Sequence, residues 1–130
     1  MHLAVDKSGK FLALKADIVG NLGAYASQFG PYIHYLCASM MTGVYKTPEI
    51  AVRLRAVYTN TVPVDAYRGA GRPEATYVVE RLVETAAREM KLSPAEIRRR
   101  NFIHEFPYAT PVGLTYDTGD YEATLKGVEE

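Results

Sequence analysis

The sequence predicts an α+β fold, a mixed α/β layer in which helices pack against one small sheet. Two short segments of alternating apolar residues flank a tight turn near the start of the chain, which is typical of a β-hairpin. A third alternating segment follows later and indicates a further strand. Much of the remaining chain repeats its apolar residues every three or four positions, the period of amphipathic helices. The predicted order is β, β, α, β, α, α, α, so a hairpin and a third strand are packed by four helices.

The predicted sheet begins almost at the first residue. Leu3 and Val5 alternate with polar neighbours, and residues 7–10 then supply the turn. The second strand covers residues 11–19, with four side chains predicted on its core face: Leu12, Leu14, Ala16 and Ile18. The third strand covers residues 50–59, where apolar side chains alternate with arginines. A strand this close to residue 1 is what we expect of a segment cut from a longer protein.

The predicted helices are marked by their start signals. Four helices are predicted over residues 32–45, 73–90, 94–101 and 121–128, and two loops over residues 20–30 and 102–119. Pro31 is suited to the first position of the first helix. Ser93 and Glu96 form a capping-box pattern before the third helix, and Asp120 is placed to cap the fourth.

Composition excludes several classes of protein. Hydrophobic residues make up 48% of the 130 residues, and 15 basic side chains balance 15 acidic ones, so a nucleic-acid or anionic-membrane partner is not expected. The single cysteine, Cys37, excludes an internal disulfide and is predicted to be buried and inert. No apolar run approaches the roughly 20 residues of a membrane span, and no signal-peptide pattern is present. We therefore expect one cytoplasmic domain over residues 1–130.

The connection at residues 65–74 is the segment best suited to chemistry. It leads from a strand into a helix and contains two glycines and two arginines: Arg68, Gly69, Gly71 and Arg72. Glycine allows close backbone approach to a ligand, free N–H groups at a helix start favour anions, and a guanidinium adds a planar fork of donors. The alternative is a plain turn whose arginines are solvated or paired with Asp65 and Glu74. From the residues alone the two interpretations stay open.

Other candidate side chains carry weaker signals. His34, on an apolar helix, is more typical of a satisfied core or interface histidine than of a ligand. The three arginines at 98–100 favour solvated side chains near a helix C-terminus over a binding patch. No His, Asp or Glu spacing resembles a metal site, so no metal ligand is predicted within the chain.

The loop also resembles a known family. Ala66-Tyr67-Arg68-Gly69-Ala70-Gly71-Arg72-Pro73-Glu74 is similar to the active-site loop of the molybdenum-binding large subunit of xanthine dehydrogenases, aldehyde oxidases and carbon monoxide dehydrogenase-like proteins. Further matches are Asn21-Leu22-Gly23-Ala24-Tyr25, Tyr45-Lys46-Thr47-Pro48, Thr59-Asn60-Thr61 and Leu92-Ser93-Pro94-Ala95-Glu96-Ile97-Arg98. The resemblance covers nearly the whole chain and implies a partial domain, a piece of a larger molybdopterin-binding region.

The resemblance implies a molybdenum hydroxylase as the parent protein. Such enzymes insert water-derived oxygen at a C–H bond of an aldehyde or N-heterocycle, using molybdopterin, possibly as the cytosine dinucleotide, and pass electrons through 2Fe–2S clusters to FAD. Arg68 matches the loop arginine beside the molybdenum, and Gly69 and Gly71 would let the backbone approach the cofactor. Partners implied are the rest of the large subunit and the subunits that carry FAD and iron–sulfur clusters.

Three positions depart from members of the family. Copper-dependent carbon monoxide dehydrogenases have a cysteine where this chain has Gly69, so copper chemistry is not expected. Purine and aldehyde enzymes place an aromatic ring at the position of Ala70, and purine enzymes an arginine at the position of Leu36, so xanthine is not the expected substrate. The resemblance assigns Tyr67, Ala70 and Leu36 to the substrate pocket.

The catalytic glutamate and a glycine-rich molybdenum-binding stretch are expected outside this chain, so no catalytic residue is predicted within it. The isolated chain is therefore expected to be inactive, and to expose apolar surface through which it could self-associate. Two alternatives stay open: a free-standing scaffold or interaction module that keeps the fold without catalysis, and a small phosphate or nucleotide binder. A phosphate-binding loop would need a lysine that does not follow these glycines.

Overall fold

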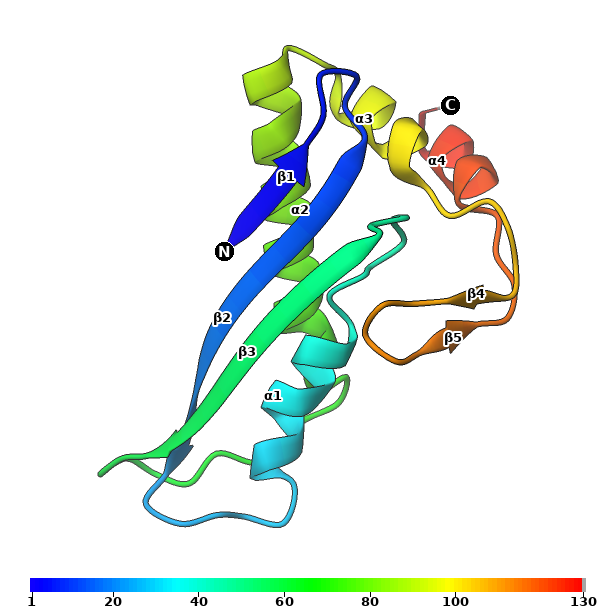
Figure 1. Ribbon diagram of the computed structural model, residues 1–130. Coiled ribbons are helices and arrows are strands. Elements are labelled where there is room, and N and C mark those ends of the chain that lie inside the picture. The colour runs from blue at the N-terminus through cyan, green and yellow to red at the C-terminus, as the bar shows by residue number, and fades with distance from the viewer. Residues whose placement is uncertain (130) are drawn as a thin grey trace.

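The computed structural model describes residues 1–129 and confirms the α+β fold (Figure 1). Its elements in chain order are β1 His2–Val5, β2 Phe11–Gly23, α1 Gly30–Ser39, β3 Glu49–Tyr58, α2 Arg72–Met90, α3 Pro94–Asn101, β4 Tyr108–Ala109, β5 Thr115–Tyr116 and α4 Tyr121–Glu129. The three long strands form one sheet, and β4 and β5 form a separate small hairpin inside the predicted loop over residues 102–119.

The main sheet has the order β1-β2-β3 and is mixed. β1 and β2 pair antiparallel as the predicted hairpin, whereas β2 and β3 run parallel over ten residue pairs, Ala13–Glu49 to Gly23–Tyr58. Parallel neighbours need a crossover connection, and the segment that contains α1 supplies it. In Figure 1, α2 passes behind the sheet and α1 lies beside the second half of β3, and α2 starts beside the last turns of α1.

The hydrophobic core lies between one face of the sheet and the two longer helices. Leu14 and Ala16 of β2 pack with Cys37 near the end of α1 and with the buried stripe of α2: Ala75, Val79, Val83 and Ala87. The other face of the sheet carries polar side chains, among them Asp17 and Arg55, which pair at 3.1 Å. The predicted apolar stripe of α2 is confirmed, because each successive turn of a helix returns the same face to the core.

The prediction for Leu12 is wrong, because β2 contains a bulge. Ala13 pairs with Ala4 but Phe11 pairs with Val5, so Leu12 is one residue extra on its strand. This extra residue shifts the alternation. Phe11 is 4% exposed and joins the core, while Leu12 is 49% exposed.

Two predicted element boundaries also differ. β2 continues to Gly23, through the first residues of the predicted loop, because β3 pairs with it as far as that glycine. α1 ends at Ser39 rather than near residue 45, and the chain continues in turns in which Gly43 has φ +57°. Met41 and Tyr45 remain buried in spite of the turns, each 1% exposed. The apolar character of this segment therefore predicted its burial correctly but not its secondary structure.

A buried asparagine fastens α3 to the first hairpin. Asn101 is 2% exposed, its Oδ1 accepts from the N–H of Phe11 at 2.7 Å, and its Nδ2 donates to the carbonyls of Gly9 and Ile97. Both predicted helix N-caps are present. Ser93 Oγ accepts from the N–H of Glu96 at 3.1 Å, and Asp120 Oδ1 from that of Ala123 at 2.9 Å.

The arginines at 98–100 are ion-paired rather than solvated, which corrects the prediction for them. Arg98 lies between α3 and α2, 2.7 Å from Glu80 and 2.9 Å from Glu84. The hydroxyl of the buried Tyr45 donates to the same Glu80 at 2.8 Å. Arg99 and Arg100 pair with Glu122 and Glu96. These charges hold helices together, so they form no free basic patch.

Candidate functional site

The connection from β3 to α2 is held in place by the segment before α1. The N–H of Val64 donates to the carbonyl of Leu22 at 3.2 Å, and the N–H of Ala24 to that of Thr61 at 3.0 Å. Ser27 Oγ donates to the carbonyl of Val64 at 2.7 Å. Residues beyond this anchored stretch turn tightly, with the N–H of Ala70 donating to the carbonyl of Tyr67 at 2.9 Å. The loop that carries Arg68 is thus positioned by β2 and the chain that follows it.

The two loop glycines have different structural roles. Gly69 and Gly71 both have positive φ, +88° and +83°. A Cβ on Gly71 would lie 2.5 Å from the N of Cys37 and 2.7 Å from the O of Ile33, both backbone atoms of α1. A Cβ on Gly69 would have only the Pro73 ring within reach, at 3.8 Å. Gly71 therefore lets the start of α2 approach α1, whereas Gly69 leaves the outer side of the loop open.

Arg68 lines a surface hollow of about 310 Å³ between the loop and α1. The other lining residues are Ile33, His34, Val64, Asp65, Tyr67, Ala70, Pro73 and Glu74. The hollow thus joins one guanidinium, one imidazole and two carboxylates with flat and apolar side chains. Two of the three residues assigned to a substrate pocket, Tyr67 and Ala70, lie in it. Leu36 does not, and its backbone instead lies under Gly71.

The charges around Arg68 exclude the ion-paired form of the plain-turn interpretation and leave a solvated or ligand-binding arginine. Within residues 1–129, Arg68 forms no ion pair with Asp65, Glu74 or any other acid. Arg68 is exposed, and in the same part of the chain the N–H groups of Arg68 and Gly69 donate no hydrogen bond. A planar cation and two backbone donors therefore remain for a ligand with anionic or carbonyl oxygens. These residues fit the oxygen-rich groups of a pterin cofactor or its substrate.

Cys37 is no part of this reactive surface. Its side chain is 7% exposed, and burial, together with the negative charge of Glu74, raises the pKa of the thiol. A raised thiol pKa lowers the fraction of nucleophilic thiolate. The predicted buried, inert cysteine is consistent with both observations.

His34 is the residue of the hollow whose role the sequence pattern missed. The expectation was a histidine with satisfied hydrogen bonds, but within residues 1–129 its buried Nε2 has no partner. Its ring lies flat against Gly20 of β2, where a Cβ would come within 2.3 to 2.5 Å of the ring atoms. A glycine inside a strand often marks such a close approach, and this is the signal by which the contact could have been found.

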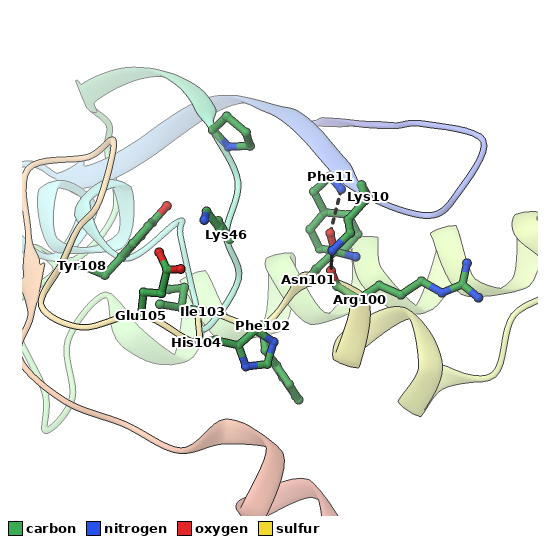
Figure 2. A pocket seen from close by; sticks show the side chains of 11 residues that line it. Lys10, Phe11, Lys46, Arg100, Asn101, Phe102, Ile103, His104, Glu105 and Tyr108 are labelled. Carbon is green, nitrogen blue, oxygen red and sulfur yellow. Dashed lines mark hydrogen bonds between the residues drawn. The ribbon is translucent and has the colours of Figure 1, made fainter.

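A larger hollow, about 360 Å³, lies at the other end of the molecule (Figure 2). Its basic residues are Lys10, Lys46, Arg100 and His104. Lys10 donates to the carbonyl of Arg100, and the Arg100 side chain extends away from Lys46 and Glu105 towards its own partners, Glu96 and the carbonyl of Ser8. Lys10 and Arg100 therefore already have partners, whereas the side chains of Lys46 and His104 form no hydrogen bond or ion pair within residues 1–129.

Two further classes of site find no support. Among residues 1–129, no group of three or more His, Cys, Asp and Glu side chains is arranged to hold a metal ion. None of the described helices combines the length and the apolar character that a membrane crossing requires.

Comparison with known proteins defines the class of the chain. Residues 1–102 match the molybdopterin cofactor-binding domain family. The chain is 37% identical to the carbon monoxide dehydrogenase large chain of Hydrogenophaga pseudoflava, over 98% of this chain and 16% of that protein. It is 36% identical to subunit gamma of the 6-hydroxypseudooxynicotine dehydrogenase complex of Paenarthrobacter nicotinovorans, over 92% of this chain and 16% of that one.

A solved structure supports the same assignment. Quinoline 2-oxidoreductase from Pseudomonas putida 86 superposes with a TM-score of 0.90 at 37% identity, covering 98% of this chain and 17% of that chain. The chain therefore belongs to the molybdopterin cofactor-binding domain family. It spans about one sixth of the length of these relatives.

Proposed function

We propose that this chain is one wall of the cofactor and substrate site in the large subunit of a molybdenum hydroxylase. The observation that carries the proposal is the unpaired Arg68 beside a positive-φ glycine, facing a hollow in a chain of the molybdopterin-binding family. The scaffold alternative gives no reason for a guanidinium and two positive-φ glycines to occur together beside a hollow. On this proposal residues 1–130 are part of a larger domain, and the isolated chain oxidises nothing.

When bound, the molybdenum cofactor supplies oxygen insertion at a C–H bond and accepts two electrons. The contribution of this chain is electrostatic. Arg68 donates hydrogen bonds to oxygen atoms at the edge of the hollow, where its charge stabilises negative charge that develops during reaction. Gly69 keeps the loop free of a side chain at that edge, and its N–H is directed by a backbone conformation that other residues rarely adopt.

The parent enzyme is proposed to act on an aldehyde or an N-heterocycle. Relatives named for 6-hydroxypseudooxynicotine and quinoline support a heteroaromatic substrate. Ala70 narrows the hollow less than an aromatic ring would, which leaves room for a ring-shaped substrate. Gly69 offers no thiolate for copper, so oxidation of carbon monoxide by a molybdenum–copper pair is not proposed. Asp65 and Glu74 line the hollow, but the catalytic base is assigned to a glutamate outside this chain.

The remaining parts of the proposal concern cofactors and partners. The molybdopterin is proposed to be a cytosine dinucleotide, with electrons leaving through 2Fe–2S clusters to FAD on partner subunits in the cytoplasm. The name of one relative as subunit gamma of a complex supports the presence of partner subunits.

The test is to measure molybdenum, pterin and turnover of the complete complex with Arg68→Ala, using Arg53→Ala as the control. Arg53 is an exposed arginine on β3. We expect Arg68→Ala to retain molybdenum and to lose about 100-fold or more in kcat, as for removal of one donor at a site of developing charge. Arg53→Ala should leave kcat unchanged. Equal activity of both variants would contradict the role of Arg68, and a complex without molybdenum would favour the scaffold alternative.

A further inference from the structure

We propose that His34 is a substrate-recognition residue, which donates a hydrogen bond from Nδ1 to an acceptor atom on a planar ligand in the Arg68 hollow. The inference rests on the proposed function for the location of the substrate. It goes beyond that function because it assigns a specific contact to α1, on the side of the hollow opposite the loop.

The first step is the placement of His34. It lines the hollow together with Arg68 and Tyr67, yet it comes from a different element, so the hollow has donors on two sides. The side chain is half-buried, and its ring cannot settle deeper because it already rests on the backbone of Gly20. The contact with β2 therefore fixes the position of the imidazole at the edge of the hollow.

The second step is the assignment of the proton. A neutral imidazole has one donor and one acceptor nitrogen. Nε2 is sealed against β2 and has no partner among residues 1–129. Orphaned buried N–H groups are rarer than under-satisfied acceptors, because an unmade donor costs its full desolvation. Nε2 is thus the lone-pair nitrogen, and the N–H at Nδ1 remains for a ligand.

The third step is the chemical class of the ligand. Beside His34, the hollow is lined by two planar groups, the guanidinium of Arg68 and the phenol ring of Tyr67, which is 89% exposed. Planar groups favour stacking on a planar ligand. The two donors, Nδ1–H and the guanidinium, favour a ring that carries a carbonyl oxygen or a ring nitrogen. A ring without an acceptor gains nothing from His34.

The test uses the complete complex, prepared from molybdenum-depleted medium so that no turnover occurs, and two probes. 2-Hydroxypyridine is planar and carries acceptors, whereas toluene is planar and carries none. Calorimetry gives the Kd of each. We expect His34→Leu to raise the Kd for 2-hydroxypyridine about tenfold, which is the effect of one lost hydrogen bond. The Kd for toluene should change less than twofold.

Two conservative variants test the assigned nitrogen. Asparagine places its amide near the position of Nδ1, so His34→Asn should restore binding of 2-hydroxypyridine to within about threefold of the wild type. His34→Gln reaches towards the position of Nε2 and should bind as weakly as His34→Leu. His104→Leu, which removes an exposed histidine at the distant hollow, is the matched control and should change neither Kd.

Each contrary result overturns the proposal. An unchanged Kd for 2-hydroxypyridine in His34→Leu would exclude the hydrogen bond, and equal losses for the two probes would show that the imidazole serves packing alone. Rescue by glutamine but not asparagine would reverse the assigned nitrogen. If His34→Leu does not fold, the Kd values of His34→Asn and His34→Gln for 2-hydroxypyridine still test the hydrogen bond. Molybdenum content and the effect of Arg68→Ala are measured separately, so failure of the proposed function is recognised independently.

Discussion

The two ends of α2 use arginine in opposite ways. From its middle towards its C-terminal end, Arg98 of α3 pairs with Glu80 and Glu84, and two further pairs join α3 to α4. Beside its N-terminus, Arg68 is exposed and has no acidic partner within residues 1–129. The difference shows that charge near α3 stabilises the fold, whereas the charge of Arg68 near the start of α2 takes no part in ion pairs within residues 1–129.

Aromatic side chains show the same contrast. Around α3 and α4 they pack on one another: the ring centroid of Tyr121 lies 6.0 Å from that of Phe102 and 5.9 Å from that of Phe106. Around the Arg68 loop and α1 they are exposed, with Tyr25, Tyr35 and Tyr67 at 71%, 62% and 89%. The predicted exposure of apolar surface is therefore confirmed at this end. Such a surface fits packing against the rest of a longer subunit.

The largest effect on stability is expected at Gly71, where the start of α2 touches the backbone of α1. Gly71→Ala places a methyl group against the backbone of α1, at a positive φ, and should cost roughly 3–5 kcal/mol of unfolding free energy. Gly69→Ala has the same φ but open space, so it should cost about 1 kcal/mol. Urea unfolding of both variants measures the difference. Equal losses would mean that backbone conformation, rather than contact with α1, explains both glycines.

The next largest effect on stability is expected from Arg98, in contrast to Arg68. Arg98→Met leaves two partly buried glutamates without a partner and should lose about 2–3 kcal/mol. Arg68→Met, at an exposed and unpaired site, should stay within about 0.5 kcal/mol of the wild type. The free energy of unfolding in guanidinium chloride is the measurement. A loss at Arg68 as large as that at Arg98 would remove the distinction between structural and binding charge.

A smaller effect is expected for the contact between His34 and Gly20. Gly20→Ala adds a methyl group that the imidazole must avoid, at a cost of about 1–2 kcal/mol. In the His34→Ala background the same change should cost less than about 0.5 kcal/mol, because the ring is gone. Thermal unfolding of the four proteins gives the coupling. Additive losses would show that the ring does not rest on Gly20.

The pH dependence of stability should reveal Tyr45. Burial, followed by the charge of Glu80, raises the pKa of this phenol well above its usual range. Above about pH 10 the unfolded chain releases the proton while the folded protein keeps it, so stability is complete below that pH and then falls by about 1.4 kcal/mol per pH unit. Tyr45→Phe should show a shallower decline in unfolding experiments at pH 9–11. An unchanged slope would assign the effect to other tyrosines.

Local patterns determined much of the fold before any contact was known. The period of the apolar residues predicted α2 within one residue of its observed start, and Ser93 and Asp120 cap helices where their spacing indicated. These features depend on neighbours in the chain, so the sequence contains nearly all the information they need. The loop motif likewise indicated the molybdopterin-binding family and singled out Arg68.

Tertiary structure decided the features that depend on distant neighbours. The bulge at Leu12 follows from pairing with β1, which alternation alone does not show. Gly71 is required by the backbone of α1, and His34 rather than Leu36 lines the hollow because of the side on which α1 packs against β2 at Gly20. The sequence by itself thus determined most of the elements, the family and the position of the loop that carries Arg68. Only the packing of α1 between that loop and the sheet decided which side chains share the hollow, because sequence spacing records the order of residues and not the distance between elements.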